Sequence, residues 1–191
     1  MASSICAAAM VSHPGASRAR VSPRWKATSS SQLTNSRSLT FTTRLALAIA
    51  TVGGIGWAPV APGTVASAVT IVALWLLALS RAQLIVAFVV VTLIGIWAAE
   101  HAERALGTKD PGAIVIDEVA GMTLSVAPFA LTPAVLVVGF VLFRLFDVTK
   151  PFPAGASQRI TGGVGVMVDD LIAGLYALLV IVIGRAVFAW P

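Results

Sequence analysis

Histidine and cysteine, the side chains that most often carry nucleophilic or metal chemistry, are nearly absent from this sequence. Its 191 residues include one cysteine and two histidines, and both Cys6 and His13 lie within the first 40 positions. The rest of the chain therefore has no disulfide, no thiolate nucleophile and no cysteine-based metal site. One histidine remains, His101, and we expect it to be a solvated helix residue rather than a catalyst.

Charged residues are also scarce. They make up 11% of the chain, against 58% hydrophobic residues and a mean hydropathy of +0.93. These values lie far outside the range of a soluble domain of this length. The composition predicts a multi-pass membrane protein of the all-α class.

Positive charge is concentrated at one end of the chain. Six of the thirteen basic residues fall in the first 44 positions, which contain no aspartate or glutamate. The rest of the chain carries seven basic and eight acidic residues, so it is nearly neutral. The net charge of +5 therefore does not indicate a nucleic-acid partner.

The first 40 residues have the composition of a targeting segment. They contain ten serines and no acids, and they lack the uninterrupted apolar core of a secretory signal. We interpret residues 1–40 as an organelle transit peptide, with a disordered cytoplasmic tail as the alternative. The Met-Ala-Ser-Ser start and the serine content favour a chloroplast over a mitochondrion. Residues 41–191 would then form a single helical membrane domain.

Five apolar segments follow the leader, at 45–52, 65–79, 84–99, 122–143 and 169–190. At about 1.5 Å per residue, the second and third are roughly 22 to 24 Å long, shorter than the roughly 30 Å core of a bilayer unless flanking residues extend them. Residues 99–107 can add an amphipathic turn, with Glu100 paired to Arg104 and Gly107 as its stop. The short "SRAQ" connection between them predicts an antiparallel hairpin. We expect a small helical membrane protein with short, partly broken transmembrane helices.

All eight carboxylates lie between positions 100 and 170. Five of them occur in three short stretches beside apolar segments, "IVIDEVAGM", "FRLFDVTKPFP" and "GGVGVMVDDLIAG". Ionisable groups at membrane depth are costly and indicate a functional site. As an alternative, the two acid pairs could start the helices that follow them, where negative charge is favoured, and Asp147 could simply pair with Arg144.

The segment 122–143 carries two helix-breaking residues, Pro128 and Pro133. If the polar segments on either side of it, 100–121 and 144–168, build one site, they must face the same side of the membrane. We therefore expect a re-entrant hairpin at 122–143 that turns between the two prolines. Such broken backbone must be covered by protein or water, so the hairpin should pack against the two preceding helices.

Adjacent acids become favourable when a cation lies between them. Mg²⁺ prefers carboxylates, waters and phosphate oxygens as ligands. Lys150 and Arg144 are phosphate-binding side chains, and the glycines of "GGVG" and "APGT" would let backbone N–H groups approach phosphate oxygens. No cysteine, histidine-pair or Asp-x-Asp-x-Thr phosphatase mechanism fits the sequence. What remains is metal-assisted attack of water on a phosphomonoester.

The three acid-bearing stretches and "APVAPGTVAS", in this order, resemble the phosphatidylglycerophosphatase A family. The resemblance covers residues from about 53 to 175. It implies removal of the terminal phosphate of phosphatidylglycerophosphate to give phosphatidylglycerol, with dependence on Mg²⁺ and a role in phospholipid synthesis. Its substrate would be this phospholipid within the membrane.

The residues expected to form the site fall into three groups. The predicted catalytic carboxylates are Asp117, Glu118, Asp147, Asp169 and Asp170. The predicted Mg²⁺ ligands are Asp117, Asp147, Asp169 and Asp170. The predicted phosphate-binding residues are Gly63, Thr64, Arg144 and Lys150. Which carboxylate acts as base stays open, as does the oligomeric state.

Two other functions compete with a phosphatase. The acids could bind the coupling ion of a small membrane transporter, although the paired repeats typical of transporters are not visible. A purely structural role in an organelle membrane gives no reason for the clustered acids.

Overall fold

The computed structural model describes residues 40–152 and 160–188. The described residues form six α-helices and one short 3-10 helix, without strands, which confirms the predicted all-α class. The elements are α1 (Phe41–Ala50), η2 (Ile55–Trp57), α2 (Pro62–Leu77), α3 (Arg81–Leu106), α4 (Ile116–Val126), α5 (Pro133–Thr149) and α7 (Gly162–Phe188). Apart from Thr40, the predicted leader lies outside the described residues.

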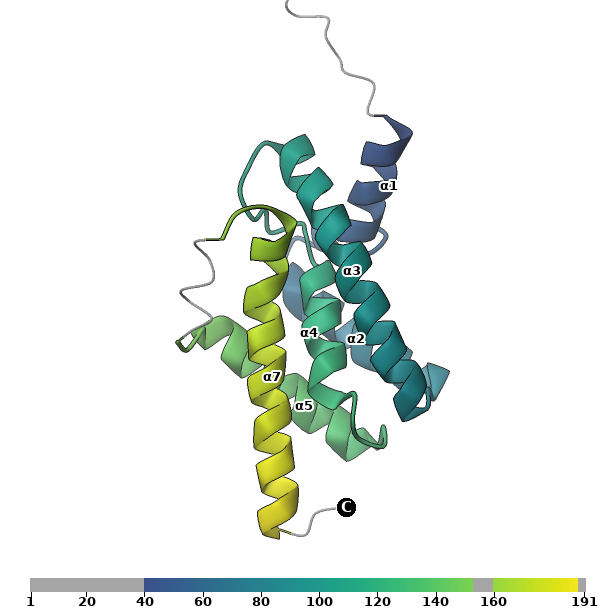
Figure 1. Ribbon diagram of the computed structural model, residues 1–191, viewed down its shortest axis with the longest axis vertical. Helices are drawn as coiled ribbons and strands as arrows, with labels where there is room; N and C mark the ends of the chain where they lie inside the picture. The colour runs from purple at the N-terminus through teal and green to yellow at the C-terminus, as the bar shows by residue number, and fades with distance from the viewer. Residues whose placement is uncertain (1–39, 153–159, 189–191) are drawn as a thin grey trace, which may run out of the picture. The chain divides into compact units, whose positions relative to one another are not determined.

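The short helix α4 is the centre of the bundle. It packs against α7, α3, α2 and α5, and Figure 1 shows it between α3 and α7. Eight of its eleven residues are buried, among them Met122 and Val126, which pack in one core cluster with Phe143 of α5 and Ala177 of α7. Because α4 is enclosed on several sides, side chains at its start are held in a protein interior.

Helix α1 holds the segment that leads into α4 in place. Its buried residues Ala46 and Ala50 belong to a face of small side chains, and α1 packs against α3, where Ala98 and Ala102 are also fully buried. Small residues allow helix backbones to come close. The carbonyl of Ala50 accepts a hydrogen bond from the N–H of Val115 at 2.9 Å, which ties the segment before α4 to the end of α1.

Two helices, α3 and α7, are long and apolar enough to cross a membrane. With 26 and 27 residues, each is roughly 39 to 41 Å long, whereas α2 and α5 have 16 and 17 residues. Large apolar side chains remain exposed along these helices, including Leu93 and Ile94 on α3 and Ile183 on α7. Such an extended apolar surface is typical of contact with lipid and supports the predicted membrane protein.

One predicted helix boundary is confirmed and one is wrong. Residues 100–106 continue α3 as helix, and Gly107, the predicted stop, ends it with a left-handed φ of +71°. The last helix begins at Gly162 rather than at position 169, so the glycine-rich "GGVG" is helical. Tertiary contact explains this, because a Cβ on Gly163 would lie 1.9 Å from the carbonyl oxygen of Ile96 on α3. The low helix propensity of glycine is outweighed by the close packing that it permits.

The predicted hairpin across "SRAQ" does not form a packed helix pair. Ser80 caps α3, and it forms a reciprocal capping box with Gln83. However, α2 and α3 make little contact with each other, and both pack against α4. The two helices are therefore joined through their common contact with α4.

The predicted break in the segment 122–143 is confirmed. Helix α4 ends at Val126, α5 begins at Pro133, and the hydroxyl of Thr132 caps α5 by accepting from the N–H of Val135. The two helices run in opposite directions, since Gly139 of α5 lies against Val126 and the later residue Phe143 lies against the earlier residue Gly121. The helices extend beyond the predicted segment at both ends, and the hairpin brings the start of α4 to the end of α5. Its orientation in a membrane stays a prediction.

Candidate active site

The acid-bearing stretches meet around one cavity of about 280 Å³. It lies where the first turn of α2, the segment before α4, the start of α4, the end of α5 and the second and third turns of α7 come together. Its ionisable wall residues are Asp110, Asp117, Glu118, Arg144, Asp147, Lys150, Asp169 and Asp170. Gly63 also lines the cavity. The lining contains every site residue predicted from the sequence except Thr64, and it contains one ionisable residue that was not predicted, Asp110.

Three carboxylates form a compact group inside this cavity. Asp117, Glu118 and Asp170 each offer an oxygen, and the three oxygens lie within 4.8 Å of one another. Asp117 and Asp170 are only 7% and 3% exposed. Oε2 of Glu118 and Oδ2 of Asp170 are buried without a hydrogen-bond partner in the described structure. Buried, unpartnered carboxylate oxygens are costly, so this group fits a divalent cation with a preference for oxygen ligands.

A close helix crossing brings these carboxylates together. Gly121 lies one turn after Asp117, and Gly174 lies one turn after Asp170. A Cβ on Gly121 would lie 2.5 Å from the carbonyl oxygen of Asp170, and one on Gly174 would lie 2.4 Å from the carbonyl oxygen of Gly121. Because no side chain separates the backbones of α4 and α7 there, the acids one turn earlier can face each other.

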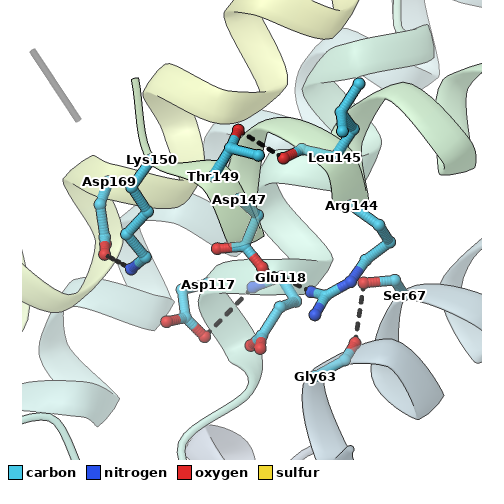
Figure 2. Close-up of polar contacts among 10 residues, drawn as sticks. All are labelled: Gly63, Ser67, Asp117, Glu118, Arg144, Leu145, Asp147, Thr149, Lys150 and Asp169. Atoms are coloured by element: carbon cyan, nitrogen blue, oxygen red, sulfur yellow. Dashed lines mark hydrogen bonds and ion pairs between the residues drawn. The ribbon is translucent and has the colours of Figure 1, made fainter. Parts of the chain in front are cut away.

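The other two predicted ligands, Asp147 and Asp169, each pair with a basic side chain. Oδ2 of Asp147 lies 2.7 Å from a terminal nitrogen of Arg144, and Asp169 pairs with the ammonium of Lys150. Figure 2 shows the side chains of these two acid–base pairs in the same region as Asp117 and Glu118. Glu118, which the sequence did not indicate as a metal ligand, takes the third place in the compact group.

Lys150 is held in position by its backbone and by its charge partners. It ends α5 with a left-handed φ of +41°, and its N–H donates to the carbonyl of Phe146 at 2.8 Å. Partial burial opposes its positive charge, but the hydrogen bond to Asp169 and the nearby acids outweigh burial and raise the pKa of Lys150. The side chain is therefore a permanent cation at the cavity.

The start of α2 brings backbone donors to the same cavity. Gly63 lies so close to Glu118 that an added Cβ would be 1.9 Å from Oε1 of that side chain. The first N–H groups of a helix have no partner within the helix and favour anions. Gly63 therefore fits its predicted role near a phosphate. Thr64 lies in the same helical turn but is not among the residues that line the cavity, and its role stays a prediction.

Asp110 lies on the cavity wall although the motifs did not indicate it. It has a left-handed φ of +44°, and its N–H donates to Oε1 of Glu103 at 2.7 Å. Aspartate tolerates this backbone region better than most residues. The sequence Asp110-Pro111-Gly112 is a turn signature, so the turn, though not its place at the site, was detectable.

Glu100 also has a role that the motifs did not reveal. Its Oε2 accepts the N–H of Gly163 at 2.6 Å, so a side chain from α3 caps the start of α7. His101 does not line the cavity, and its Nδ1 lies 2.8 Å from the carbonyl of Trp97 within its own helix. This arrangement agrees with the expectation that His101 is not a catalyst.

Comparison with known proteins gives a consistent result. The family model described as "Phosphatidylglycerophosphatase A" matches residues 48–185. A Bacteroides thetaiotaomicron protein with the provisional name phosphatidylinositol-3-phosphatase is 36% identical over 74% of this chain and 94% of its own length. The phosphatidylglycerophosphatase A proteins of Haemophilus influenzae and Escherichia coli are each 34% identical, over 67% and 64% of this chain and 81% and 73% of their own lengths. No solved structure is significantly similar to the chain. The chain therefore belongs to the phosphatidylglycerophosphatase A family of membrane lipid phosphatases.

Proposed function

We propose that this protein hydrolyses the terminal phosphate of phosphatidylglycerophosphate in a Mg²⁺-dependent reaction, giving phosphatidylglycerol and inorganic phosphate. The observation that carries the proposal is the meeting of two buried carboxylates and one half-buried carboxylate with two basic side chains and a helix start in one cavity. Carboxylates alone would repel a phosphate, and basic residues alone would not hold a metal ion. Both kinds of group side by side suit a phosphomonoester bound together with a cation.

The compact group would hold the ion, through Asp117, Glu118 and Asp170. When bound, Mg²⁺ supplies positive charge to the phosphate oxygens and lowers the pKa of water. These residues fit the ion because their oxygens are hard ligands and two of the oxygens lack a hydrogen-bond partner among the described residues. The participation of Asp147 and Asp169 as further ligands, expected from the sequence, would require them to leave their basic partners.

Arg144 and Lys150 are assigned to the substrate phosphate. The planar guanidinium of Arg144 can donate two parallel hydrogen bonds to phosphate oxygens, and the ammonium of Lys150 acts as a compact charge. Asp147 and Asp169 would orient these two side chains through the ion pairs in which they take part. N–H groups in the first turn of α2, beginning with Gly63, would complete the phosphate site.

The reaction forms a bond between a water oxygen and phosphorus and breaks the bond between phosphorus and the glycerol oxygen. A carboxylate of the cavity takes a proton from the attacking water, and the leaving glycerol oxygen ends protonated. The negative charge that develops on the phosphate oxygens is met by Arg144, Lys150 and the backbone donors.

The names of the relatives describe two substrates, both phosphomonoesters on the polyol headgroup of a lipid. We favour phosphatidylglycerophosphate because the family model and two relatives carry that name. Phosphatidylinositol 3-phosphate is the second candidate, because the B. thetaiotaomicron protein is named for it.

The test is phosphate release by the purified full chain in detergent micelles containing either lipid. With phosphatidylglycerophosphate we expect turnover in Mg²⁺, loss of turnover in excess chelator, and recovery when Mg²⁺ is added back. Full activity in chelator would overturn the metal requirement. Faster hydrolysis of phosphatidylinositol 3-phosphate would overturn the substrate assignment, and no release from either lipid would overturn the function.

We also propose that residues 1–40 direct the protein to the chloroplast, as their composition predicts. A fluorescent protein fused to these residues should enter chloroplasts in plant cells. Accumulation of the fusion in the cytosol or in mitochondria would contradict this assignment.

A further inference from the structure

A second cavity of about 320 Å³ adjoins the catalytic cavity. It lies between the end of α3, the segment that follows it and the first turns of α7, with Val166 on its apolar side. Asp110 and Asp169 line both cavities, so they form the boundary between the two spaces. A group attached to a phosphate in the catalytic cavity could therefore extend past these carboxylates into the second cavity.

The lining of the second cavity indicates what it would bind. Among the described residues it contains three carboxylates, from Glu103, Asp110 and Asp169, and the ammonium of Lys109. An excess of carboxylates disfavours a phosphate inside this cavity, so the phosphodiester of the lipid would lie outside it. Carboxylates are strong hydrogen-bond acceptors, so a neutral group that carries hydroxyl donors suits this cavity.

Asp110 is the best-placed acceptor because its backbone is fixed. Its N–H is held by Glu103, its backbone is in the left-handed region, and Pro111 follows it. Asp169, the other shared carboxylate, is already paired with Lys150. Asp110 therefore combines a defined backbone position with a place in the lining of both cavities.

We infer that the second cavity binds the hydroxyl-bearing part of the lipid headgroup and that Asp110 accepts a hydrogen bond from its hydroxyl group. This inference rests on the proposed function and specifies it further. Asp110 is then a specificity-determining residue that selects phosphate esters of polyols over phosphate esters of alcohols without a neighbouring hydroxyl. The phosphate itself is bound in the catalytic cavity by other residues.

The experiment compares phosphatidylglycerophosphate with an analogue whose headgroup hydroxyl is replaced by hydrogen. For the wild-type full chain in detergent we expect kcat/KM to be roughly tenfold to a hundredfold higher with the natural headgroup, the value of one hydrogen bond to a charged group. Asp110→Ala should reduce this ratio to near one. Asp110→Asn, which keeps an acceptor oxygen but no charge, should give an intermediate ratio.

Thr108→Ala is the matched control, because Thr108 is exposed in the same loop and lines neither cavity; it should keep the wild-type ratio. A purely structural effect of Asp110→Ala would lower both rates by the same factor and leave the ratio unchanged, which would overturn the inference. Equal rates of the wild-type chain on the two lipids would also overturn it. If the wild-type chain released phosphate from neither lipid, the proposed function would fail first and this inference with it.

Discussion

The two pairs of adjacent acids, one on α4 and one on α7, enter the same cavity in different ways. Asp117 and Glu118 occupy the first turn of α4, and both belong to the compact carboxylate group. Asp169 and Asp170 lie about two turns inside α7, and only Asp170 belongs to the group. Asp169 instead pairs with Lys150, because neighbouring side chains on a helix point in different directions.

This difference between the two acid pairs separates two explanations for acids beside apolar helices: that they start the helix, or that they form the site. At the start of α4, the positive end of the helix stabilises negative charge, so helix formation and the site favour the same residues. Two turns inside α7 this effect has faded, and the cap of α7 comes from Glu100 on another helix. The acids of α7 therefore have no role in starting their helix.

The largest expected effect comes from the buried members of the two pairs. Asp117→Asn and Asp170→Asn should each lower kcat on phosphatidylglycerophosphate by at least about a hundredfold, because each removes a charge from the group assigned to the metal ion. The concentration of Mg²⁺ needed for half-maximal activity should rise as well. Asparagine keeps the side-chain shape, so thermal unfolding in detergent should confirm a folded protein. A kcat within tenfold of wild type for both variants would show that these acids are not essential.

The second-largest effect is expected when the close contact between the backbones of α4 and α7 is disturbed, because this contact brings the two acid pairs together. Gly121→Ala places a methyl group against the backbone of Asp170, so the helices must separate. We expect activity to fall roughly tenfold to a hundredfold, and the free energy of unfolding to fall by about 1 to 3 kcal/mol. Kinetics and thermal unfolding of the same preparation measure both.

Gly184→Ala on α7 is the control for this substitution. In the part of the chain that the structure describes, no atom beyond the adjoining residues and backbone of α7 lies within 4 Å of the added Cβ, and glycine inside a helix is less stable than alanine. This variant should keep its activity and gain up to about 1 kcal/mol of stability. If Gly121→Ala behaved in the same way, the close crossing would not position the carboxylates.

The smallest effect is expected for the acid that lies outside the compact group. Asp169→Asn removes the charge partner of Lys150 but leaves the three-carboxylate group intact. We expect KM to rise by roughly tenfold, with a smaller loss in kcat than for Asp170→Asn. Thr149→Ala, next to Lys150 and hydrogen-bonded only within α5, should change neither constant. A loss in kcat as large as that of Asp170→Asn would place Asp169 among the metal ligands.

The sequence by itself determined the class of this protein and most of the residues that line its candidate site. Hydropathy predicts membrane helices because burial in lipid requires long apolar segments, and Pro128 and Pro133 predict the break that separates α4 from α5. The acids and their basic neighbours could be selected because few other polar side chains occur in so apolar a chain. These properties depend on composition and on local backbone chemistry, which the order of residues contains directly.

The tertiary structure alone decided which carboxylates share one site and where the neighbouring polar space lies. Glu118 joins Asp170 because Gly121 and Gly174 allow the backbones of α4 and α7 to come into contact. Asp110 reaches the cavity because Glu103 on α3 holds its backbone in place. The helix crossing joins residues far apart in the chain, and the contact of Asp110 with Glu103 depends on the course of the loop after α3. Neither hydrophobic periodicity nor motif spacing specifies them.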